Sequence, residues 1–140
     1  MNVLAVPPAE FSWIERRTGC VLTRNARAIK AVDRCGLTVG MVAYDSWTEN
    51  AVQAHMAVDS PIAWRSLLWP AFAYPFEQAG LGVLLAVINA GNTKSLDLAL
   101  HFGFREAHRL VDGWAKGEDI IFLEMRREKC RWLERRRKAA

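Results

Sequence analysis

His55 is the residue of this chain whose type and position are best suited to acid–base chemistry. It lies in the middle of a β-rich run, residues 51–59, and an imidazole ring exchanges a proton near neutral pH. A single histidine in a strand is more often a packing or hydrogen-bonding residue than a base, so both interpretations stay open. Glu49 and Asp45 flank the turn before this run. Each can act through a water molecule or be a solvated turn carboxylate.

The other reactive side chains form no catalytic motif. No Ser-His-Asp or Cys-His arrangement is supported, and His101 and His108 have no partner at an informative spacing. The three cysteines, Cys20, Cys35 and Cys130, are widely spaced and odd in number. That pattern fits neither a disulfide framework nor a metal site, so we expect reduced thiols and no bound metal.

The spacing of apolar and helix-breaking residues predicts the elements that position these side chains. Helices are predicted over residues 8–18, 62–79, 92–103 and 128–138, and strands over residues 26–33, 37–47, 51–59, 83–88, 105–112 and 119–126. The second helix is expected to kink, because Pro70 and Pro75 each remove a backbone hydrogen bond. Residues 83–88 are all apolar, which is typical of a strand buried on both faces. Asn92 can cap the following helix and Gly103 can end it.

The segment from Val83 to Phe104 resembles part of the GNAT (GCN5-related N-acetyltransferase) superfamily: a buried strand, Asn92-x-x-Ser95, a short helix and Gly103-Phe104. The order of predicted elements matches the GNAT architecture, and the closing hairpin is most similar to ribosomal-protein-acetylase-type and phage-encoded members. The resemblance implies an α/β (α+β) fold, a single domain with a GNAT-like mixed central sheet flanked by helices. It also implies an N-acetyltransferase in which an amine acceptor directly attacks the thioester of acetyl-CoA.

The resemblance further assigns site residues. Contacts with acetyl-CoA are implied for the backbone of Met56, Ala57 and Val58, for Ser60, Ala63 and Arg65 in the phosphate loop, and for Asn92 and Ser95 at the helix start. The family's phosphate loop contains glycine, whereas residues 59–66 contain none. Ala99 stands where many members have the Tyr that protonates the leaving thiolate. His55 and Glu49 are the candidate catalytic residues, because an ammonium acceptor must lose a proton before it attacks.

Basic residues gather at the end of the sequence. The net charge is +4 over 140 residues, but residues 126–140 hold eight Arg or Lys and two Glu, a local charge of +6. We divide the chain into a GNAT-like acyltransferase domain, residues 1–125, and a basic helix or tail of the same domain, residues 126–140. From Arg126 to Lys138 this tail can bind nucleic acid or another polyanion, or serve solubility alone.

Composition narrows the class of protein. Hydrophobic residues make up 51% of the chain and six are Trp, which predicts a folded core. No apolar stretch reaches the roughly 18 residues of a membrane-spanning helix, and the first residues lack a signal-peptide pattern, so we expect a cytoplasmic protein without membrane contact. A homodimer is compatible with these features. Two alternatives stay open: a catalytically inactive GNAT-shaped binding or structural protein, and a nucleic-acid-associated protein.

Overall fold

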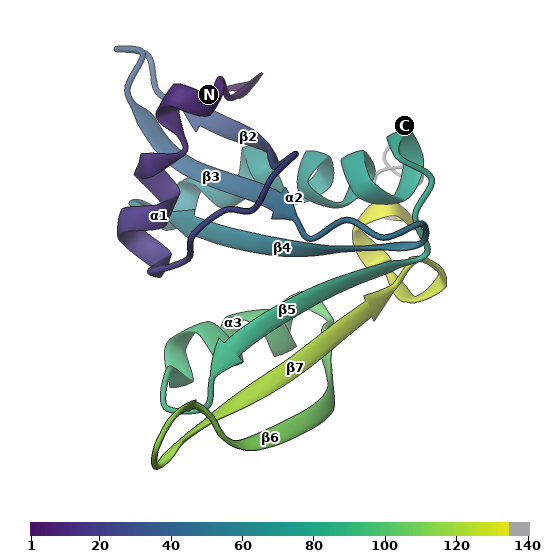
Figure 1. Cartoon of the computed structure of the whole chain (residues 1–140). Coiled ribbons are helices and arrows are strands. Elements are labelled where there is room, and N and C mark those ends of the chain that lie inside the picture. The colour runs from purple at the N-terminus through teal and green to yellow at the C-terminus, as the bar shows by residue number, and fades with distance from the viewer. Residues whose placement is uncertain (135–140) are drawn as a thin grey trace.

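Seven strands form one mixed sheet in the order β1-β2-β3-β4-β5-β7-β6 (Figure 1). The computed structural model describes residues 1–134. The strands are β1 (Asn2–Ala5), β2 (Arg27–Val32), β3 (Thr38–Asp45), β4 (Ala51–Val58), β5 (Val83–Asn89), β6 (Arg105–Ala115) and β7 (Glu118–Arg126). Neighbouring strands are antiparallel except β4 and β5, which are parallel. The predicted α+β fold, a single mixed central sheet flanked by helices, is confirmed.

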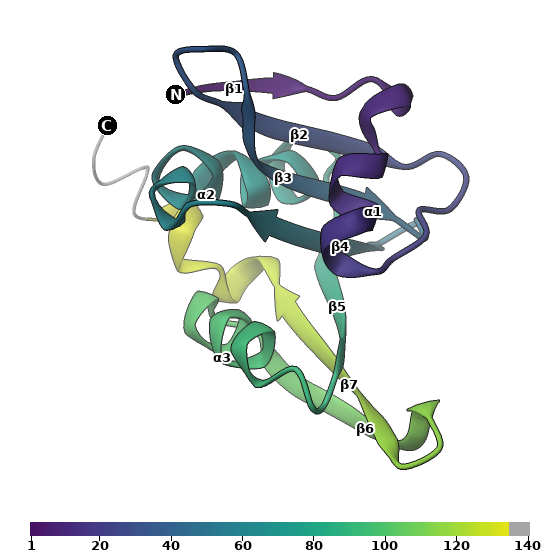
Figure 2. The same ribbon diagram turned by 90° about the vertical axis from the view of Figure 1, so that its left-hand side faces the viewer.

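Helices cover both faces of this sheet. The α-helices are α1 (Ser12–Thr18), α2 (Trp64–Ala73) and α3 (Thr93–Phe102), with 3-10 turns at Pro8–Glu10, Pro61–Ala63 and Arg127–Lys129 and a π-helical turn at Tyr74–Gln78. Figure 2 shows α1 on one side of the sheet and α2 and α3 on the other. Within residues 1–134, no helix is both long and apolar enough to cross a membrane.

Two apolar cores lie on the two faces. The larger core joins α2, α3 and the sheet, and the fully buried Leu67, Phe72 and Leu84 belong to it. The smaller core places Ile14 of α1 against Met41 and Ala43 of β3. Alternate residues of β3 therefore face opposite helices, as a strand buried on both faces requires.

β4 and β5 pair over only part of their length. Residues Ala51, Val52 and Gln53 pair with Val83, Leu84 and Leu85, and the two strands then diverge (Figure 1). Only Leu84 and Ala86 of β5 are buried. The prediction that residues 83–88 are buried on both faces was therefore wrong, because the divergence leaves one face of the strand open.

Glycine and proline mark the element ends largely as predicted. Gly19 ends α1 and Gly103 ends α3, both in the left-handed conformation that glycine adopts without a steric penalty. The expected kink in the long helix is the change from α2 to the π-helical turn that contains Pro75. The edge strand β1 was not predicted, because its four residues are followed by Pro7 and Pro8 and carry little apolar periodicity.

The last described residues pack against the core. Cys130 and Leu133 are buried, and the Trp132 Nε1–H donates a hydrogen bond of 2.8 Å to the Phe102 carbonyl. The Trp132 ring stacks on Phe72, with centroids 6.5 Å apart. Residues 135–138 of the predicted final helix lie outside the described residues, so polyanion binding by the whole tail stays a prediction.

Gly40 of β3 lies directly against Leu67 of α2. A Cβ at this position would lie 2.8 Å from Leu67 Cδ1 and 3.0 Å from Val58 Cγ1. We expect Gly40→Ala to lower the free energy of unfolding by about 1–3 kcal/mol, the usual cost of overpacking. Urea unfolding monitored by tryptophan fluorescence measures this change. Gly91→Ala is the matched control, because a Cβ there meets Asn89 Oδ1 at an ordinary 3.4 Å; equal losses in both variants would contradict the packing argument.

Candidate functional site

The divergence of β4 and β5 opens a cleft of about 1390 Å³. Its lining comes from the end of α1, from β4 and β5, from the start of α2, from the length of α3 and from the β6–β7 hairpin. A volume above the roughly 300–1,000 Å³ of common ligand pockets gives room for two substrates. The cleft is therefore the candidate active site.

A histidine and a buried carboxylate lie together on one wall. His55 Nε2 is 2.7 Å from Asp45 Oδ1, and the second oxygen, Asp45 Oδ2, accepts a hydrogen bond of 3.0 Å from the Thr23 amide. Asp45 is only 2% exposed. With its proton on Nε2 donated to Asp45, the imidazole presents Nδ1 as a proton acceptor. The interpretation of Asp45 as a solvated turn carboxylate was wrong.

The loop before β2 holds this pair in place. Ser46 and Asn25 have positive φ angles of 55° and 67°, which are uncommon outside glycine. The Ser46 amide donates to Thr23 Oγ1 at 3.2 Å, and Trp47 Nε1 donates to the Asn25 carbonyl at 3.0 Å. The end of β3 and the loop are thus fixed to each other, and Asp45 is oriented by both.

Cys20 also lines this wall but is not an activated thiol. Burial raises the pKa of the Cys20 thiol, and the carboxylates of Asp45 and Glu15 raise it further, while a hydrogen bond with Thr18 lowers it. A nucleophilic cysteine needs the opposite shift. Cys20 therefore contributes a small neutral surface to the cleft.

The opposite wall is lined by α3, and its first turn carries the predicted ligand contacts. Asn92 Oδ1 accepts a hydrogen bond of 3.2 Å from the Ser95 amide, which is a helix N-cap. Asn92, Lys94 and Ser95 all line the cleft. Capping and contact with a ligand are compatible at this place, and the contact stays a prediction.

The exposed edge of β4 lies between the two walls. Met56, Ala57 and Val58 line the cleft beyond the last residue pair with β5. An unpaired strand edge presents backbone N–H and C=O groups that can bind a peptide-like ligand. Successive residues direct their N–H and C=O groups to alternate edges of a strand, so the open edge offers the backbone groups of some of these three residues, and the predicted contacts stay a prediction.

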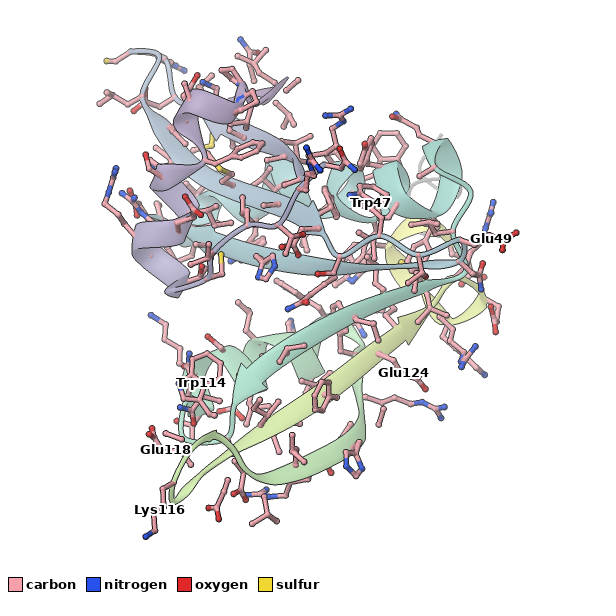
Figure 3. The ribbon with its side chains drawn as sticks, in the orientation of Figure 1. Trp47, Glu49, Trp114, Lys116, Glu118 and Glu124 are labelled. Atoms are coloured by element: carbon pink, nitrogen blue, oxygen red, sulfur yellow. The ribbon has the colours of Figure 1, made fainter. Side chains whose placement is uncertain are left out.

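Four predicted site residues are not among those that line the cleft: Glu49, Ser60, Ala63 and Arg65. Glu49 is an exposed residue of the β3–β4 turn, beside Trp47 and far from the hairpin tip that carries Trp114 (Figure 3). Ala63 is fully buried, and its amide donates to the Ser60 carbonyl at 3.0 Å. Arg65 is exposed on α2, outside the cleft.

An ion pair stands at the end of the cleft where β4 leads into α2. Arg17 Nε and Nη2 donate to the two oxygens of Asp59 at 2.7 and 2.9 Å. The hydrogen bond from Arg17 holds the pKa of Asp59 below its ordinary value. Any stability from this pair is present above the ordinary carboxyl pKa and is lost as pH falls through the lowered one; it is small, because solvent screens the pair. Sequence gave no signal for it, because the residues are 42 positions apart.

Comparisons with known proteins support the fold. No protein-family model matches the chain, and no curated protein sequence does. Mutant spermidine/spermine N-acetyltransferase SpeG from Vibrio cholerae superposes with a TM-score of 0.76 at 15% identity, covering 96% of this chain and 98% of that one. SpeG from the same organism in complex with manganese ions superposes with a TM-score of 0.73 at 14% identity, covering 96% of this chain and 95% of that one. These similarities establish the GNAT fold of the chain.

Proposed function

We propose that the chain is an N-acetyltransferase that moves the acetyl group of acetyl-CoA to an amine. The observation that carries the proposal is the cleft between β4 and β5, with a strand edge for the thioester arm and a hydrogen-bonded His55–Asp45 pair beside it. Asn92 and Ser95 would contact the arm from α3, opposite Met56, Ala57 and Val58.

The hydrogen-bonded His55–Asp45 pair can take the proton that the acceptor must lose. An acceptor that arrives as an ammonium ion gives a proton to His55 Nδ1, and Asp45 stabilises the resulting imidazolium. The neutral nitrogen then forms a bond to the thioester carbonyl carbon, while a backbone amide near Ala57 or Val58 stabilises the oxyanion. As the carbon–sulfur bond breaks, the nitrogen gives its second proton to solvent water, and the departing thiolate takes a proton from solvent, since Ala99 offers no acid.

Acetyl-CoA is expected to raise the melting temperature of the protein. A ligand that binds only the folded state adds about 2.7 kcal/mol of stability at a hundredfold excess over its Kd. The same samples, supplied with an amine panel headed by spermidine and spermine, should release free thiol as acetyl groups are transferred. Those two amines are chosen because they are named for the structurally similar enzyme. No thermal shift at millimolar acetyl-CoA would contradict the proposal.

A second candidate is a GNAT-shaped binding protein without catalysis. It is favoured by the glycine-free connection between β4 and α2, where Ala63 is buried and its amide is already bonded. A thermal shift with acetyl-CoA but no thiol release from any amine would favour this candidate.

A further inference from the structure

The charges that line the cleft do not suit a polyanion. Coenzyme A carries about four negative charges, from a pyrophosphate and a 3′-phosphate. Among the described residues, the cleft is lined by four carboxylates, Asp45, Asp59, Asp97 and Glu118, and by two cationic side chains, Arg17 and Lys94. The surplus of carboxylates repels phosphate groups instead of attracting them.

Arg17 is the better placed of the two cations, but three of its five N–H donors are already used. Its Nε and Nη2 bond to Asp59, its Nη1 donates to the Trp13 carbonyl at 2.9 Å, and its guanidinium carbon lies 3.6 Å from the centre of the Trp13 ring. A phosphate that takes the Nε–Nη2 face of Arg17 must displace the bidentate carboxylate of Asp59, which offsets the gain from the new contact.

The backbone at the start of α2 offers few free donors. Pro61 lines the cleft and has no N–H. The Ala63 amide donates to Ser60, and the Trp64 amide donates within the 3-10 turn. The ordinary means by which a helix N-terminus binds an anion, several unpaired amides, is thus reduced at this end of the cleft.

We infer that the cleft recognises its acyl donor through the pantetheine thioester, with the nucleotide of coenzyme A adding little affinity. The strand edge at Met56, Ala57 and Val58 suits the two amides of pantetheine, which can pair with it as a further strand would. The donor class is then acyl thioesters of pantetheine, with or without a nucleotide. This inference rests on the proposed function.

Isothermal titration of the full chain with coenzyme A and with pantetheine tests the inference. We expect the two Kd values to lie within about fivefold, because a single charge-assisted hydrogen bond to a phosphate would already separate them by about tenfold or more. Acetyl-pantetheine should likewise support thiol release at a rate within about tenfold of acetyl-CoA, at equal saturation.

The variant Asp59→Asn provides a second test of the inference. Removing this carboxylate frees Arg17 and takes one negative charge from the cleft, so coenzyme A should bind about 3- to 10-fold more tightly, while the Kd of pantetheine stays unchanged. Glu106→Gln is the matched control, since Glu106 is exposed on β6 and outside the cleft. Both Kd values should be unchanged in that variant.

Two outcomes would overturn the inference, and only one of them would also contradict the proposed function. Binding of coenzyme A at least 100-fold tighter than pantetheine, lost in Lys94→Ala, would mean that α3 holds the phosphates; the proposed function would survive. Binding of neither compound, in protein shown to be folded, would remove the proposed function and the inference together.

Discussion

His55→Ala is expected to lower kcat for acetyl transfer by about 10²- to 10⁴-fold, the usual contribution of a positioned general base. The His55 side chain lies in the cleft with 13% of its surface exposed, and Nε2 of its ring is 2.7 Å from Asp45 Oδ1. Without the ring, the ammonium acceptor must lose its proton to water before it can attack. A steady-state assay of thiol release, with acceptor and acetyl-CoA both saturating, measures the loss.

The pH dependence separates a base from a structural residue. The deficit of His55→Ala should shrink as pH rises toward the pKa of the acceptor, because the amine then arrives already neutral. A deficit that stays constant over pH would contradict the role of base. His108→Ala is the matched control, because His108 is an exposed histidine of β6 outside the cleft, and its activity should equal that of the unmodified chain.

Leu133→Ala is expected to lower the free energy of unfolding by about 2–5 kcal/mol, the range for a buried leucine truncated in a core. Leu133 is 3% exposed and belongs to the same core as Phe72 and Phe102. The basic composition of residues 126–140 hides this role, since most of the residues around Leu133 are charged. Urea unfolding of the full-length variant measures the loss.

The matched control is Leu100→Ala, a leucine of α3 that is 50% exposed. Its truncation should change stability by about 0.5 kcal/mol or less. Similar losses in the two variants would mean that residues near Leu133 do not pack as part of the core in solution.

The sequence predicted where helices and strands begin and end better than it predicted which of their residues are buried. The β3–β4 hairpin and the two ends of α3 were confirmed, because turn residues, the Asn92 cap and Gly103 set the backbone of the few residues next to them. The burial of residues 83–88 was wrong because an apolar residue that faces a cleft has the same type as one that faces a core. Only the divergence of β4 and β5, a property of the whole sheet, separates the two cases.

The candidate site was predicted in part for similar reasons. His55 was found from its type, and the signal for Asp45 was present in the hairpin register: Asp45 pairs with Gln53, so its side chain shares a face with His55. The pair of Arg17 and Asp59 had no such signal, because it joins α1 to the end of β4 across 42 residues. Ala63 was assigned to a phosphate contact, and its complete burial follows from packing against β3 that no local pattern encodes.

The short pairing of β4 with β5 gives the cleft a mechanical property. Val58 lies five residues beyond Gln53, the last residue of β4 that pairs with β5, which is roughly 16 Å along a strand. Over that lever arm, a rotation of ten degrees at the paired end moves the far end by about 3 Å, close to the length of one hydrogen bond. Small torsions near Asn50 and Gly82, where the Gly82 amide bonds to Asn50, therefore change the separation of the two walls at their far end.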